Sequence, residues 1–246
     1  MQTRHVIGIA IPIVLLLGPV LVACSGTVRF NDDWRTADRS SARIAPDPRT
    51  AQEAIVQVYA ARAFAWRGAF AVHTWIATKL RGAEQYRVHQ VVGWRQYDHL
   101  PVVESEADIP DRNWYGQPPE ILIDLRGAQA EAVIAGIETA VQSYPWPDEY
   151  RLWPGPNSNT FTAWIARHVP ALRLDLPPTA IGKDFLGAFF APAPSGTGYQ
   201  ASLYGLLGVT VARSEGLEIN VLGACVGLNP LKLQLRLPGL GVVGAG

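Results

Sequence analysis

The stretch WPGPNSNTF, residues 153–161, carries the strongest local structural signals in this chain. Two prolines stiffen its first half, and the short polar side chains of Asn157, Ser158 and Asn159 are typical of a helix start. The helix is expected to run to about His168. Ser158 therefore stands at a predicted helix N-terminus, where free backbone N–H groups and the helix dipole stabilise negative charge.

Three apolar stretches ahead of this segment predict antiparallel strands. They span residues 54–63, 70–79 and 85–94. Each is rich in Val, Ile, Tyr or Trp, and short glycine-containing breaks separate them, which favours a meander. His73 lies in the second stretch, and a histidine on a strand that faces the helix start could take a proton from Ser158.

The rest of the chain predicts an α+β fold with two main helices. A long polar loop is expected at 95–119 and a short strand at 120–125. Apolar residues spaced near the helical period predict a helix over 127–144: Ala130, Val133, Ile134, Ile137 and Val141. Apolar runs at 203–212 and 217–226 predict a β-rich C-terminal extension of hairpins, with buried helices as the alternative. We expect these runs to form a core sheet rather than a membrane-facing patch.

The run from Gly155 to Phe161 resembles the Asn-Cys-Asn-Thr-Phe motif of circularly permuted papain-like proteins, a superfamily that includes NlpC-type amidases and the lecithin-retinol-acyltransferase group. In that superfamily the histidine strand precedes the nucleophile helix, as it does here. The resemblance implies His73 as the base and Ser158 as the nucleophile, with Asn157 and Asn159 beside it. The polar residue that orients the histidine would fall on the next strand, at one of three positions: Arg87, His89 or Gln90.

Serine stands in this chain where those enzymes have cysteine. A thiol near a helix N-terminus is readily ionised, whereas a serine hydroxyl needs full general-base assistance in the transition state. The resemblance therefore favours the fold more strongly than the reaction. Each residue also has a structural interpretation, because His73 would suit a hydrogen-bonded core position and Ser158 would serve as an N-cap worth about 1 kcal/mol.

The chain also resembles a bacterial family known as domain of unknown function 3750. The matching stretches are residues 73–76, 91–94, 144–161 and 181–184, and the resemblance covers roughly residues 55–230. It implies no substrate.

Residues 1–23 are typical of an export segment, with Arg4 at the start, an apolar stretch, and Leu-Val-Ala-Cys at its end. This pattern resembles the lipobox of bacterial lipoproteins, which implies that Cys24 carries lipid and holds the chain at a membrane. An uncleaved single-span anchor is the alternative. In either case the domain would face the periplasm or the exterior. We expect a polar tether at 24–50, one domain at 51–230 and a C-terminal tail at 231–246.

Composition excludes several classes of function. Lys plus Arg and Asp plus Glu number 21 each, and no basic run occurs, which argues against a nucleic-acid partner. We expect no cofactor, because the sequence lacks a phosphate-binding loop, and no metal site, because His, Cys, Asp and Glu lack ligand spacing. Cys225 lies in an apolar setting and is expected to be an unreactive core thiol, and Lys183 and Asp184 are expected on a solvated surface.

Two functions remain open from the sequence. The first is a cell-envelope lipoprotein with a degenerate or serine-variant papain-like domain of the hydrolase or acyltransferase type, acting through Ser158 and His73 if activity survives. It would bind a small molecule, a peptide or a lipid. The second is a non-catalytic structural or interaction lipoprotein.

Overall fold

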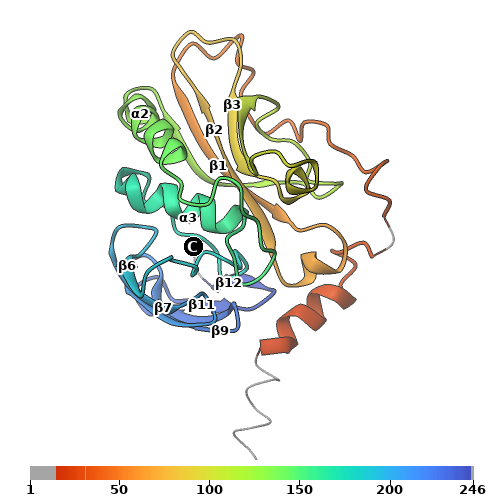
Figure 1. Cartoon of the computed structure of the whole chain (residues 1–246), viewed down its shortest axis with the longest axis vertical. Helices are drawn as coiled ribbons and strands as arrows, with labels where there is room; N and C mark the ends of the chain where they lie inside the picture. The colour runs from red at the N-terminus through yellow and green to blue at the C-terminus, as the bar shows by residue number, and fades with distance from the viewer. Residues whose placement is uncertain (1–14, 31, 245–246) are drawn as a thin grey trace, which may run out of the picture.

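The computed structural model describes residues 15–30 and 32–244, which form two antiparallel sheets and two main helices (Figure 1). The first sheet contains β1 (Ile55–Arg62), β2 (Val72–Lys79), β3 (Arg87–Val91), β4 (Val103–Ala107) and β5 (Glu120–Arg126). The helices are α2 (Ala128–Gln142) and α3 (Ser158–His168). The second sheet contains β6 (Phe190–Pro192), β7 (Gly198–Leu203), β8 (Leu207–Ala212), β9 (Gly216–Val221), β10 (Ala224–Asn229), β11 (Gln234–Leu237) and β12 (Gly241–Gly244). Short 3-10 helices are η1 (Ala65–Ala69), η2 (Gly93–Asp98) and η3 (Pro170–Leu172).

The predicted mixed α/β architecture with antiparallel sheets is confirmed. Strands β1 to β4 pair in chain order as a meander, and β5 adds to the free edge of β1, giving the order β4-β3-β2-β1-β5. The predicted strand positions agree with β1, β2 and β3. The loop expected at 95–119 instead contains η2 and the edge strand β4, whose pairing with β3 runs from Arg87↔Ala107 to Val91↔Val103.

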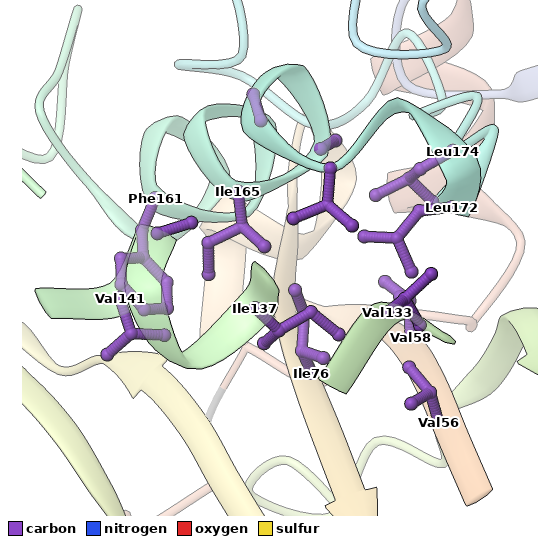
Figure 2. Packing of buried hydrophobic residues seen from close by; sticks show 14 of the residues in the cluster. Val56, Val58, Ile76, Val133, Ile137, Val141, Phe161, Ile165, Leu172 and Leu174 are labelled. Carbon is purple, nitrogen blue, oxygen red and sulfur yellow. The ribbon is translucent and has the colours of Figure 1, made fainter. Parts of the chain in front are cut away.

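The main core lies between one face of the five-stranded sheet and the two helices. Alternate residues of β1, including Val56 and Val58, point to this side and belong to the same core as Ile137 of α2 and Ile165 of α3 (Figure 2). The five α2 positions predicted from the helical period are all buried. The opposite face of the same sheet has its own buried cluster, which contains Tyr59, Trp75 and Val88. Strands β1 and β2 are therefore buried on both faces.

The seven-stranded sheet points its polar side chains toward the protein and its apolar side chains toward solvent. The polar side chains that point inward are buried: Gln200, Ser202, Thr210, Glu218, Asn220, Asn229 and Arg236. The apolar side chains that point outward are exposed: Tyr199, Leu203, Leu207, Val209, Val211, Leu217, Ile219, Leu228, Leu235 and Val243. We call this second set the outer apolar face. The expectation that the C-terminal strands form a core sheet is wrong for this face.

Ion pairs fill the space under the inward side of the seven-stranded sheet. The Glu218 carboxylate accepts hydrogen bonds from Lys183 Nζ and Arg236 Nε, both at 2.6 Å. Arg236 also donates to Asp175 at 2.8 Å, and Lys183 Nζ lies 3.5 Å from Asp184. Lys183 and Asp184 are each 2% exposed, so the expectation of a solvated surface is wrong for both. Their charges are accommodated because each has a partner of opposite sign.

The segments flanking the domain are more ordered than the sequence predicts. Residues 24–50 were expected to be a polar tether, yet Asp111 accepts hydrogen bonds from the Ser41 hydroxyl at 2.8 Å and from the Ile44 N–H at 2.7 Å. The tail expected at 231–246 instead contributes β11 and β12 to the seven-stranded sheet. Its apolar residues therefore belong to a sheet rather than to a free end.

We predict that Glu218→Gln lowers the free energy of unfolding by about 3–5 kcal/mol, because it leaves Lys183 and Arg236 buried without their shared carboxylate. Burial alone would raise the pKa of Glu218, but Lys183 and Arg236 outweigh burial and lower it below its ordinary value of 4.5. The ionised Glu218 carboxylate therefore makes its full contribution to the free energy of unfolding above pH 4.5, and this contribution is lost as the pH falls below that value. Chemical denaturation of both proteins between pH 3 and pH 7 measures the effect. An unchanged unfolding midpoint in the variant would contradict the account.

Candidate functional site

His73 lies in an aromatic stack on the face of the five-stranded sheet that is remote from the helices. Its ring stacks on Trp114, with centroids 3.5 Å apart and planes 8° apart, and lies 5.6 Å from the ring of Trp75. The Nε2 atom of His73 is 3.3 Å from the side-chain oxygen of Gln90, whose amide donates to Glu104 at 2.8 Å. His73 is 7% exposed. One face of its ring is therefore covered by an indole, and the Gln90 amide is its polar neighbour.

The N-terminus of α3 is capped by Asn157. Its side-chain oxygen accepts hydrogen bonds from the N–H groups of Asn159 at 3.0 Å and Thr160 at 3.2 Å. The Thr160 hydroxyl accepts from the Asn157 N–H at 3.1 Å, which completes a capping box. The structural interpretation of Ser158 as the N-cap is therefore wrong by one position, because Ser158 is the first residue of the helix. Asn157 makes the contacts that a cap requires.

Asn159 fastens α3 to strand β2. Its amide nitrogen donates to the carbonyl oxygen of Val72 at 2.9 Å and of Ile181 at 2.8 Å. Its oxygen accepts a hydrogen bond from the Thr74 hydroxyl at 2.9 Å, and this hydroxyl is also 2.9 Å from that of Thr162. Thr74 therefore points toward α3.

The direction of Thr74 fixes the direction of His73. Successive side chains of a strand point to opposite faces of a sheet, so the neighbour of Thr74 points away from α3. The contacts agree, because His73 stacks on Trp75 and Trp114, on the side opposite the helices. Ser158 belongs to α3, and among the described residues no hydrogen bond joins its side chain to His73. The structure does not bring the two predicted catalytic residues together.

Of the three residues expected to be candidates for orienting His73, Gln90 is the one whose side chain contacts its ring. The register between β2 and β3 places the Gln90 side chain on the same face of the sheet as Trp75, next to His73. His89 points to the helix side, where it meets the Thr78 hydroxyl at 3.0 Å and Glu138 of α2 at 3.7 Å. Arg87 is exposed and lies 3.9 Å from Glu138. Gln90 thus has the contact expected of the third residue, but its partner does not face the serine.

A family model described as a protein of unknown function, DUF3750, matches residues 53–185, which is more than half of the chain. The chain belongs to this family. The matched region begins just before β1 and ends before β6, so it includes the five-stranded sheet, α2 and α3. It stops short of residue 230, where the sequence resemblance was expected to end. No curated protein and no solved structure matches the chain.

Burial strongly disfavours the charged form of His73 in this DUF3750 protein. It lowers the pKa of His73 from 6.5 to about 3, against a small opposing effect of the Gln90 hydrogen bond. Burial and the nearby Arg87 lower the pKa of His89 to about 4. Both imidazoles are therefore neutral at pH 7. A general base works best when its pKa is near the working pH, so His73 is a weak base for a serine hydroxyl.

The aromatic neighbours of His73 were not identified from the sequence. Trp114 comes from the segment between β4 and β5, and Trp94 of η2 lies against it with centroids 5.8 Å apart. Only the fold brings these residues to His73, because Trp114 lies in the segment that the sequence predicts to be a long polar loop and Trp94 lies just before it. Surface hollows of about 860 and 550 Å³ occur elsewhere, and neither is lined by His73 or Ser158.

The two cysteines of the DUF3750 protein differ in environment. Cys24 is exposed at the end of the helical residues 15–24. Cys225 is 1% exposed and burial raises the pKa of its thiol, which donates to Asp184 at 3.2 Å.

In the part of the chain that the structure describes, none of the helices has the length and hydrophobicity needed to cross a membrane. Over the same residues, no cluster of three His, Cys, Asp or Glu side chains could hold a metal ion.

We predict that Asn159→Ala lowers the free energy of unfolding by roughly 2–3 kcal/mol, because it removes three buried hydrogen bonds that join α3 to Val72, Thr74 and Ile181. Ser158→Ala is the matched control, one position away on the same helix. It should change this free energy by less than about 1 kcal/mol, since alanine has a high helix propensity. Urea denaturation of both variants measures the difference. A larger loss for Ser158→Ala than for Asn159→Ala would contradict this assignment.

Proposed function

We propose that this protein is a membrane-anchored lipoprotein of the cell envelope whose α+β domain acts as a non-catalytic binding module. One observation carries the non-catalytic part of the proposal. The imidazole of His73 lies on one face of the five-stranded sheet, and the helix that begins with Ser158 packs on the other. A nucleophile and its base need to be within hydrogen-bond reach or joined through one water, and a sheet between them prevents this.

The remaining polar residues of the motif also have structural roles. Asn157 caps α3 and donates to the carbonyl oxygens of Leu152 and Ile181, both at 3.1 Å. Asn159 joins α3 to β2. Because both side chains are fully used in this way, neither is free to stabilise an oxyanion. The motif therefore serves the attachment of a helix to a sheet.

A circularly permuted papain-like core is part of the proposal. In support, β1, β2 and β3 precede α3 in the chain, and the first turn of α3 packs against β2. Serine in place of cysteine and a pKa of about 3 at His73 fit a degenerate member of such a superfamily. In this account the ancestral arrangement is kept for its shape, and the hydrolase or acyltransferase chemistry is lost.

The anchor rests on Leu21-Val22-Ala23-Cys24 and on the exposure of Cys24. Val28, four residues later, is buried against Ala69, so the chain after Cys24 is held to the domain. Lipid on Cys24 would then keep the domain close to the membrane, facing the periplasm or the exterior. The partner could be a small molecule, a peptide or a lipid.

We predict that a fluorophosphonate probe leaves Ser158 unmodified, because His73 lies on the other face of the sheet and cannot take the proton from its hydroxyl. The full chain is incubated with the probe and each serine is then assigned by peptide mass spectrometry. A known serine hydrolase in the same reaction shows that the probe is active. Modification of Ser158 that disappears in His73→Ala would contradict the proposal and favour the hydrolase alternative.

A further inference from the structure

The outer apolar face has no charged residue. Strand register aligns its side chains in rows across the sheet, as in the pairs Val211↔Leu217 and Leu228↔Leu235, with Val209↔Ile219 in the next row. Every outward-pointing side chain on β7 to β11 is apolar or a tyrosine, whereas the charges of these strands, Glu218 and Arg236, point inward. An antiparallel sheet of a water-soluble domain normally has the opposite arrangement. A continuous apolar surface of this kind marks an interaction site.

One end of the seven-stranded sheet is basic. Arg213 lies in the turn after β8, Lys232 in the turn after β10, and both line the 860 Å³ hollow together with Arg173. Arg173 and Arg213 are exposed, and among the described residues neither is paired with a carboxylate. Lys232 is bound to Asp175 at 3.2 Å. This end of the sheet therefore offers two free cations beside the apolar surface.

The candidate lipid anchor lies at the opposite end of the same sheet. The turn between β11 and β12 contains Gly239, where an added Cβ would be 2.8 Å from the backbone of Ala69. Val28 also packs on Ala69. Cys24 is thus near one end of strands that are about 20 Å long, and the basic hollow is at the other.

We propose that the outer apolar face rests on a lipid bilayer, with anionic headgroups at the basic end and the lipid of Cys24 at the other. This inference rests on the proposed function, because it uses the anchor at Cys24. The outer apolar face would contact the lipid acyl chains, which have no charge and form no hydrogen bonds. Arg173 and Arg213 would contact lipid phosphates, because an anionic membrane surface attracts nearby cations. The five-stranded sheet would then be held away from the membrane.

The test places a nitroxide label at the centre of the face through Ile219→Cys in the full chain. Glu84→Cys, an exposed site in the β2–β3 hairpin at the far end of the molecule, is the matched control. Wild-type protein gives the background, because Cys225 is buried and the thiol of Cys24 carries lipid under the proposed function. Each protein is reconstituted in vesicles of phosphatidylethanolamine and phosphatidylglycerol. Collision rates with oxygen, which enters bilayers, and with a nickel chelate, which does not, then report the surroundings of the label.

We expect the ratio of oxygen to nickel-chelate collisions to be several-fold higher at position 219 than at position 84. Arg173→Gln combined with Arg213→Gln should lower the ratio at 219 and leave it unchanged at 84. Equal, water-like values at both positions would overturn the inference. Spin–spin broadening at 219, with both reagents excluded, would show that a second copy of the chain covers the face, and would also overturn it.

A separate variant distinguishes failure of this inference from failure of the proposed function. Cys24→Ser should release the protein from membranes of the producing cell and abolish incorporation of labelled palmitate. If Cys24→Ser loses palmitate but the label at position 219 gives water-like collision rates, the lipid anchor is supported and the contact between the outer apolar face and the membrane is contradicted. Unchanged membrane retention of Cys24→Ser would contradict the lipid anchor, while the label at 219 would still decide whether the face meets lipid.

Discussion

The alternation of side chains across a β-strand is the constraint on which the rest of this structure depends. In β2 it directs Thr74 to helix α3 and His73 to the aromatic stack on the other side of the sheet. In β9 it directs Glu218 to the buried ion pairs and Ile219 to solvent. The first division separates the two residues that a hydrolase would need. The second leaves an apolar sheet face uncovered.

Helix α3 connects the two halves of the molecule and explains why the Asn-Ser-Asn-Thr motif is built as it is. Its first turn is tied to β2 through Asn159, and its last turn reaches the second sheet through Arg167, which donates to the Gln200 side chain at 2.6 Å. Polar residues that look catalytic in the sequence are thus used to position a helix between two sheets. A motif of a catalytic superfamily can be retained for this reason after its chemistry is gone, and this is the sense in which we propose a degenerate domain.

Local patterns in the sequence located β1, β2, β3, α2 and α3 but missed β4, β11 and β12, and they did not show which way the side chains of the strands point. The spacing of Val133, Ile137 and Val141 identified α2, because a helix with one buried side has a 3.6-residue period. Strand β2 is buried on both faces, so its sequence gives no sign of which side His73 takes. In β9 the alternation was visible, but an apolar side is normally the buried side. Only the contact with Lys183, 35 residues earlier, shows that the polar side is inward.

The surroundings of the His73 ring test the central claim most directly. Through-space NMR contacts from the carbon-bound protons of this imidazole, recorded on the isotope-labelled full chain at pH 7, identify its neighbours without any assumption about activity. The account predicts strong contacts to the indole of Trp114, whose ring centroid is 3.5 Å away, and weaker contacts to Trp75. Contacts from the His73 ring to the Ser158 side chain, with none to Trp114, would contradict it.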